Sequence, residues 1–307
     1  SRNFANKVWN ASRFIMMNME GKEVTDASDS LEPVDKWIIS KLNSLVKEVT
    51  DNMENFELGI AVQKIYDFIW DEFCDWYIEM VKPRLYNSDD TASQNAALWT
   101  LKTVLVDALK LLHPYMPFIT EEIFCTLQSE EESIMISNWP EFKDEWDNKA
   151  AENKAELMKA LTRGIRNRRS EMNVAPSRKA KVYIVADDDA TKETLTSLVS
   201  SYQHLISASE VHVQSDKTGI EDNAVSVVID KATIYMPLAD LVDLAKEKER
   251  LEKEKKRLEG ELKRVNGMLN NEKFMSKAPE AKINEEKAKL EKYQAMMSKV
   301  EEEFAAL

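Results

Sequence analysis

Residues 113–123 read His-Pro-Tyr-Met-Pro-Phe-Ile-Thr-Glu-Glu-Ile and join two segments of helical periodicity. Before this stretch, an apolar position recurs at helical spacing in Leu101, Val104, Leu105, Ala108, Leu109 and Leu112. Pro114 and Pro117 then stop that helix, because proline has no backbone N–H to donate. A second helix is predicted to begin near Thr120, with Glu121 and Glu122 at the positive end of its dipole. The stretch therefore predicts a tight helix–helix corner inside a bundle.

Residues 1–150 continue this helical pattern on both sides of the corner. Apolar or aromatic positions recur at helical spacing over residues 4–15, 33–49, 58–81 and 92–112, and again from about residue 120. We expect Lys82-Pro83 to end the third of these helices. The expected architecture is an antiparallel bundle of five helices with a core rich in aromatic side chains.

Residues 151–238 have a different character and predict a small α/β module. A basic helix is expected to run to Met172, where Asn173-Val174-Ala175-Pro176 breaks it. Short β-branched runs at 180–185, 211–213 and 225–229 predict strands, and residues 190–206 predict a helix.

Residues 239–307 carry heptad repeats, which predict an antiparallel coiled-coil hairpin. Seven-residue spacing relates Leu244, Leu251, Leu258 and Val265, and also Leu241, Lys248, Lys255, Leu262 and Leu269. After Pro279 it relates Ile283, Leu290, Met297 and Phe304, and also Tyr293, Val300 and Leu307. A first helix of about 30 residues would be roughly 45 Å long. We expect the lysine stems on the seam to reach outward. The chain as a whole is thus predicted to be mainly α, with three domains.

Composition and motifs argue against catalysis by this chain. Its three histidines stand apart, its six glycines are scattered, and its two cysteines lie alone in apolar surroundings. We therefore expect no catalytic residue, no metal ligand, no cofactor and a reducing, cytoplasmic location. We read His113 as a capping or packed histidine. No apolar run is long enough to span a membrane, and the start without methionine suggests that the chain begins inside a longer protein.

A local basic segment stands out against the net charge of −13. Residues 154–181 hold nine Lys or Arg against two Glu, a local balance of +7. Within it, the arginines of the predicted helix are candidates for contact with a polyanion: Arg163, Arg166, Arg168 and Arg169. The alternative interpretation is a solvated basic helix face.

The first predicted helix carries a second candidate site. Asn10, Arg13 and Phe14 fall within about one helical turn. They supply an amide for a base edge, a guanidinium for phosphate or base, and a ring for stacking, as recognition of single-stranded RNA requires. In the alternative interpretation Phe14 belongs to the core and Arg13 to a surface ion pair.

Five further stretches, in order along the chain, resemble one family together with residues 113–123. They are residues 2–14, 35–43, 70–79, 165–174 and 271–279. The chain resembles the valyl, leucyl and isoleucyl class I aminoacyl-tRNA synthetases in their anticodon-binding part, and the valyl form most. The terminal coiled coil disfavours the leucyl form, and the absence of a cysteine-rich tail disfavours the isoleucyl form. Phe124 departs from the tryptophan of many members, an apolar exchange at an expected core position.

The resemblance implies that the bundle reads a valine anticodon through the region of Asn10, Arg13 and Phe14. It also implies that the coiled coil rests against the tRNA elbow. Arg250, Arg257 and Arg264, seven apart on the first arm, are candidates for that contact. An equally weighted alternative is that they pair with Glu254, Glu261 or the facing helix.

The family further implies a parent that attaches valine to its tRNA with ATP and Mg, as a monomer in the cytoplasm. The fragment would hold the C-terminal portion, without the catalytic and editing domains, and would be inactive alone. Residues 273–277, Lys-Phe-Met-Ser-Lys, partly resemble the Lys-Met-Ser-Lys-Ser loop of the family, but the partner signature is missing from the sequence. The expected partner of this chain is tRNA with a valine anticodon, not DNA or a membrane. The rival hypothesis is a coiled-coil scaffold that binds another protein.

Overall fold

The computed structural model describes residues 2–242, 244–271, 276 and 278–305. The chain forms two compact units, Ser1–Met236 and Pro237–Leu307. The first unit contains the helical bundle and the α/β module, and the second contains the coiled coil. The fold class predicted from sequence is confirmed.

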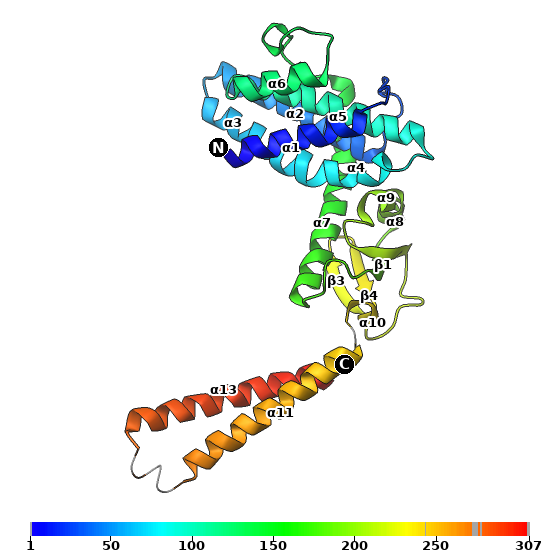
Figure 1. Cartoon of the computed structure of the whole chain (residues 1–307). Helices are drawn as coiled ribbons and strands as arrows, with labels where there is room; N and C mark the ends of the chain where they lie inside the picture. The colour runs from blue at the N-terminus through cyan, green and yellow to red at the C-terminus, as the bar shows by residue number, and fades with distance from the viewer. Residues whose placement is uncertain (1, 243, 272–275, 277, 306–307) are drawn as a thin grey trace. The chain divides into compact units, whose positions relative to one another are not determined.

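The bundle is built from helices that pack side by side (Figure 1). These are α1 (Arg2–Met19), α2 (Pro33–Glu54), α3 (Leu58–Asp67), the π-helix η1 (Phe68–Tyr77), α4 (Ile78–Leu85), α5 (Thr91–Leu112) and α6 (Pro117–Leu127). Two short 3₁₀ helices, η2 (Ile134–Ile136) and η3 (Asp144–Trp146), follow. The bundle core holds large side chains that are fully buried, among them Trp37, Phe73, Tyr77 and Phe124.

The predicted corner at residues 113–123 is present. Helix α5 ends at Leu112, and α6 begins with Pro117 at its first turn, where the missing N–H costs no helical hydrogen bond. The imidazole Nδ1 of His113 lies 2.7 Å from the hydroxyl of Thr120, so this histidine links the two sides of the corner.

A buried ion pair fixes α4 against α2. The guanidinium of Arg84 donates to both carboxylate oxygens of Asp35, at 2.8 and 2.9 Å, and the Tyr77 hydroxyl donates to the same carboxylate at 2.7 Å. Burial raises the pKa of Tyr77, and the charge of Asp35 raises it further. Removing either Arg84 or Asp35 alone is costly, because the remaining charge would stay buried without a partner.

The prediction that Lys82-Pro83 ends the third helix was wrong. The helix continues from α3 through the π-helix η1 into α4, with Pro83 inside α4. Proline at position 83 leaves the carbonyl of Glu79 without its usual helical donor. The imidazole Nε2 of His204, from the α/β module, donates to that carbonyl oxygen at 2.6 Å instead. A contact between distant segments therefore supplies the hydrogen bond that the helix loses.

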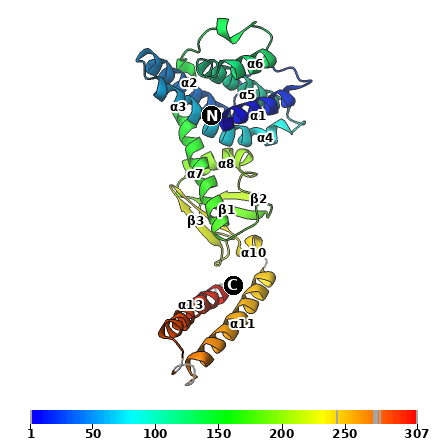
Figure 2. The same cartoon turned by 60° about the vertical axis from the view of Figure 1, so that its left-hand side comes forward.

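Helix α7 (Lys149–Glu171) runs from the bundle to the sheet (Figure 2). At its start, the Ser40 hydroxyl donates to the Glu152 carboxylate at 2.6 Å. Further along, Gly164 lies against β3: a Cβ atom there would come 3.0 Å from Val227 Cγ1 and 3.4 Å from Ile229 Cγ2. The absence of a side chain at this position lets the helix approach the strand closely.

The module has a four-stranded sheet in the order β2-β1-β4-β3. Its elements are β1 (Ala180–Ala186), α8 (Asp189–Ser197), α9 (Val199–Tyr202), β2 (Ala208–Gln214), β3 (Val225–Ile229) and β4 (Ala232–Met236). Strand β1 pairs parallel to β2 and antiparallel to β4. Sequence reasoning missed β4, and the helix expected over 190–206 is two helices that divide at Leu198.

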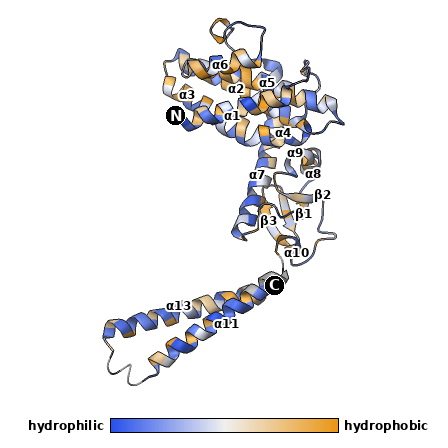
Figure 3. Ribbon diagram, in the orientation of Figure 1, coloured by the Kyte–Doolittle hydropathy of each residue, from blue (hydrophilic) through white to orange (hydrophobic). Residues whose placement is uncertain are grey.

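The second unit contains α10 (Leu238–Leu241), α11 (Leu244–Leu269) and α13 (Glu280–Ala305). The seam of α11 buries Leu251, Leu258 and Val265, and the two leucines form one cluster with Val300 and neighbouring side chains of α13. Lys255 on the seam reaches Glu301 of α13 at 3.0 Å, and the rest of both long helices is largely hydrophilic (Figure 3). The sequence predictions also include residues 272–275, 277 and 307, which lie outside the described residues.

Across the described part of the chain, no helix is both long and apolar enough to cross a membrane.

Candidate nucleic-acid interface

Helix α1 presents the predicted trio on one face. Its opposite side is fixed to the bundle by the buried side chains of Phe4, Val8, Ser12 and Ile15. Asn10 and Arg13 are exposed and Phe14 is half-buried. Among the described residues, Arg13 has no ion-pair partner within 4.0 Å, so its guanidinium is available to a ligand.

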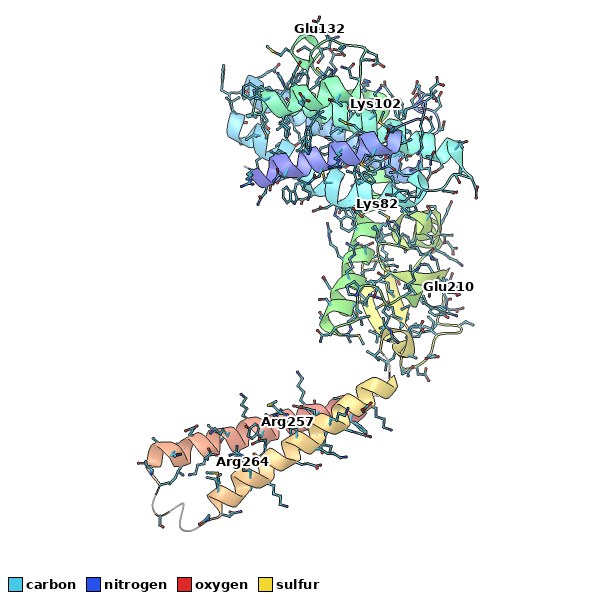
Figure 4. The ribbon with its side chains drawn as sticks, viewed as in Figure 1. Lys82, Lys102, Glu132, Glu210, Arg257 and Arg264 are labelled. Atoms are coloured by element: carbon cyan, nitrogen blue, oxygen red, sulfur yellow. The ribbon has the colours of Figure 1, made fainter. Side chains whose placement is uncertain are left out.

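Lys82 extends this face, and sequence reasoning did not select it. Its ammonium Nζ lies 5.6 Å from the centroid of the Phe14 ring and 2.6 Å from a carboxylate oxygen of Glu79. Figure 4 labels Lys82 where the bundle approaches the α/β module. Residues 14 and 82 lie on different helices, so no local sequence pattern could have brought them together.

The arginines of α7 fall into different environments. Arg163 is exposed with its guanidinium 5.2 Å from the Trp76 ring centroid. Arg166 is also exposed and donates through Nε to the carbonyl of Leu205 at 2.8 Å. The structure brings these two arginines to the side of α7 that meets other elements of the first unit.

Arg168 and Arg169 are adjacent in sequence but differ in exposure. Arg168 is exposed and pairs with Glu171 at 3.1 Å. Arg169 is 6 % exposed, and its Nη2 donates to the carbonyls of Ala175 and Arg178. Burial lowers the pKa of Arg169, and the neighbouring charge of Arg178 lowers it further. Its guanidinium therefore holds the loop that follows α7 in place and does not lie on the surface.

Lys159, counted in the basic segment, is also buried. Its Nζ lies 2.8 Å from Glu72 and 2.8 Å from Glu156, and the Trp37 and Trp76 rings lie within 6 Å of it. The local balance of +7 thus overstates the surface charge, because part of it is neutralised inside the first unit.

The arginines of the coiled coil are paired within their own helix. Arg257 Nη2 lies 2.6 Å from Glu254, and Arg264 Nη2 lies 2.8 Å from Glu261 (Figure 4). Hydrogen bonds that the guanidinium groups donate to these carboxylates, together with the carboxylate charge, raise the pKa of both arginines. Both guanidinium groups are about half exposed, at 50% and 51%. Exposed pairs of this kind contribute little stability, so a phosphate can replace the carboxylate at small cost. The side chain of Arg250 lies outside the described residues.

Within residues 2–242, 244–271, 276 and 278–305, no cluster of three or more His, Cys, Asp or Glu side chains is arranged to hold a metal ion. Cys74 and Cys125 are free thiols. Burial raises the pKa of Cys74 to about 12, which keeps this thiol protonated and unreactive.

Two family models match the chain. Residues 35–184 match the anticodon-binding domain of tRNA ligases, and residues 243–307 match the tRNA-binding arm of valyl-tRNA synthetases. The first range covers most of the bundle and α7 but not α1, so the trio on α1 lies outside it.

Curated relatives match the chain along its length. Valine–tRNA ligase of Clostridium tetani is 53% identical over 311 residues, which cover 100% of this chain and 35% of that protein. Valine–tRNA ligase of Clostridium perfringens is 50% identical, with the same coverage, and that of Bacillus anthracis is 40% identical over 99% of this chain. The chain spans about a third of the length of these relatives. It belongs to the valyl-tRNA synthetase family, of which it carries the anticodon-binding domain and the tRNA-binding arm.

Proposed function

We propose that this chain binds tRNA with a valine anticodon, as the tRNA-recognising part of a valine–tRNA ligase. The observation that carries the proposal is the arrangement of Asn10, Arg13 and Phe14 on one anchored face of α1. Asn10 and Arg13 offer polar groups to base edges and phosphates, and Phe14 offers a partly exposed ring to a base. Because α1 is packed along its other side, the backbone that carries these groups is held in position before RNA binds.

The remaining basic residues supply affinity and position. Arg163, Arg166 and Arg168 on α7, and Arg257 and Arg264 on the arm, are exposed cations that suit backbone phosphates. We propose that the arm, including Arg250, contacts the tRNA elbow. We leave Arg169 out of this interface because its guanidinium is buried.

The activity of the whole enzyme is part of the proposal. A complete protein would attach valine to its tRNA in the cytoplasm with ATP and Mg, acting as a monomer. The chain described here would contribute tRNA recognition and would not catalyse that reaction alone. The match of residues 243–307 to a tRNA-binding arm favours RNA as the partner over the protein scaffold considered from the sequence.

A binding measurement with the purified chain tests the proposal. We expect tRNA with a valine anticodon to bind with an affinity that falls as salt rises. Arg13→Ala should weaken binding, whereas Arg2→Ala, which removes the same charge from an exposed position on the same helix, should have little effect. Absence of tRNA binding at low salt, with a molecular mass that rises with protein concentration, would instead support the scaffold.

A further inference from the structure

A pocket of about 390 Å³ lies between the bundle and the α/β module, within the first compact unit. It is lined by Pro83 of α4, by the loop after α7, and by α9 and the turn that follows. The lining residues are Pro83, Pro176, Ser177, Lys179, Ser200, Gln203, His204, Ser207 and Ala208. A pocket of this volume is within the range that holds small ligand groups.

The chemistry of the pocket favours an anion. Lys179 contributes an exposed ammonium that has no carboxylate within 4.0 Å in the described part of the chain. Three serine hydroxyls line the same pocket, and no Asp or Glu does. A larger pocket, of about 640 Å³, is lined by Lys154 and Lys231 together with the carboxylates of Glu156, Asp188 and Asp230, so acidic side chains outnumber basic ones there.

Hydrogen bonds hold the walls of the smaller pocket in place. His204 is tied to the Glu79 carbonyl, and Arg166 to the Leu205 carbonyl, which fixes the turn after α9. On the other side, Arg169 donates to the carbonyls of Ala175 and Arg178, on both sides of Ser177. The Ser207 hydroxyl donates to the Pro176 carbonyl at 3.0 Å, which connects the turn after α9 to the loop after α7.

A chain of pairwise contacts links Phe14 of α1 to the wall of the pocket. The Phe14 ring lies beside Lys82, Lys82 pairs with Glu79, and the Glu79 carbonyl accepts the hydrogen bond from His204 of the pocket wall. Pro83, the next residue after Lys82, lines the pocket itself. Phe14, Lys82 and the pocket wall are therefore linked by direct contacts within the first compact unit.

We propose that this pocket binds a backbone phosphate of the same tRNA whose anticodon the trio contacts, with Lys179 as its main charge. The inference rests on the proposed function and extends it to residues of the α/β module. The hydroxyls of Ser177 and Ser200 donate hydrogen bonds to the phosphate oxygens, while that of Ser207 stays bonded to the Pro176 carbonyl. Because a phosphate carries no sequence information, this contact adds affinity and fixes the register of the strand without choosing between bases.

The test compares the full chain with Lys179→Ala on two tRNAs, one with a valine anticodon and one changed at the central anticodon base. Loss of one phosphate contact should weaken binding to both tRNAs by the same factor, about 3- to 10-fold, and reduce the slope of log K against log salt by about 0.7–0.9. Lys102→Ala, which removes a partly exposed lysine of α5 near Glu130, is the matched control and should change neither quantity.

A second variant and a mapping experiment keep the test decisive. Ser177→Asp places a carboxylate in the pocket and should weaken binding more than Lys179→Ala does. Ethylation of one tRNA phosphate should weaken binding to the wild-type chain but not further weaken binding to Lys179→Ala.

The outcomes separate this inference from the proposed function. If the chain prefers the valine anticodon but Lys179→Ala binds both tRNAs as the wild type does, the pocket is not a phosphate site and the proposed function stands. Loss of the preference in Lys179→Ala, or an equal loss in Lys102→Ala, would also overturn the inference. If the wild-type chain binds no tRNA, the proposed function and the inference fail together.

Discussion

His204 donates a hydrogen bond from its imidazole Nε2 to the carbonyl oxygen of Glu79, at 2.6 Å, across the boundary between bundle and α/β module. Glu79 stands four residues before Pro83, so its carbonyl is the one that the proline cannot serve. The histidine thus supplies the hydrogen bond that the Glu79 carbonyl of α4 lacks, and the same bond connects the module to the bundle. The same turn forms one wall of the pocket that holds Lys179.

Loss of this hydrogen bond should destabilise the first unit. We expect His204→Ala to lower the free energy of unfolding by about 0.5–1.5 kcal/mol, the net contribution of one hydrogen bond, because the Glu79 carbonyl would lose its protein partner. His204→Gln should recover part of the loss, since its side-chain amide can donate from a similar position. Urea unfolding measures both, with His212→Ala, an exposed histidine of β2, as the control. Equal stability of His204→Ala and the wild type would contradict the role given to this bond.

The same histidine should make stability depend on pH. Burial lowers the pKa of His204 from its ordinary value of 6.5, and the charges of Lys82 and Arg166 add to this effect against the opposing influence of Glu79. The unfolded chain therefore binds a proton more readily than the folded one, and stability falls as pH drops below about 6.5. The difference in stability between wild type and His204→Gln should shrink over that window. A difference that stays constant from pH 7.5 to 5.5 would exclude His204 as the titrating group.

Lys159 should behave as a core residue despite its charge. Its side chain is 2% exposed and sits between Glu72, Glu156 and two tryptophan rings. We expect Lys159→Ala to cost about 2–4 kcal/mol, because Glu72 would be left partly buried without its partner. Lys154→Ala, an exposed lysine of the same helix, should stay within about 0.5 kcal/mol of the wild type. Similar thermal unfolding of the two variants would show that Lys159 is not a structural link.

Gly164 should tolerate no larger side chain. The methyl groups of Gly164→Val would meet Val227 and Ile229 of β3, which already lie 3.0 and 3.4 Å from the position of a Cβ atom. The expected loss is about 1–3 kcal/mol. Gly59→Val, with no atom within 4 Å of its Cβ, provides the matched helical control and should be nearly neutral. If Gly164→Val is as stable as the wild type in chemical denaturation, β3 must shift freely away from α7.

Patterns local in sequence predicted most of the architecture. The corner at 113–123, the heptads and three of the strands were visible because each repeats within a few residues. The errors arise where distant segments meet. Pro83 lies inside α4, where His204 bonds the carbonyl that the proline leaves free. Lys159 and Arg169 are buried with partners distant in sequence or in the loop, namely Glu72 and the carbonyls of residues 175 and 178.

The candidate interface was only partly visible for the same reason. Helical spacing placed Asn10, Arg13 and Phe14 on one face, but the proximity of Lys82 and the pocket of Lys179 depends on tertiary packing. On the coiled coil, the spacing of Arg257 and Arg264 was visible, and their pairing with Glu254 and Glu261 is the alternative that the sequence left open.

The central claim is that α1 reads the anticodon. It is tested most directly by the ratio of dissociation constants for two tRNAs that differ only at the central anticodon base. We predict a preference of about tenfold or more for the valine anticodon in the wild-type chain, since hydrogen bonds to a base edge contribute about 1–3 kcal/mol of discrimination. The preference should fall towards one in Asn10→Ala and persist in Phe118→Ala, which removes an exposed ring of α6. Phe14→Ala should weaken binding to both tRNAs, because stacking accepts any base. A ratio of one in the wild type, or an unchanged ratio in Asn10→Ala, would contradict the claim.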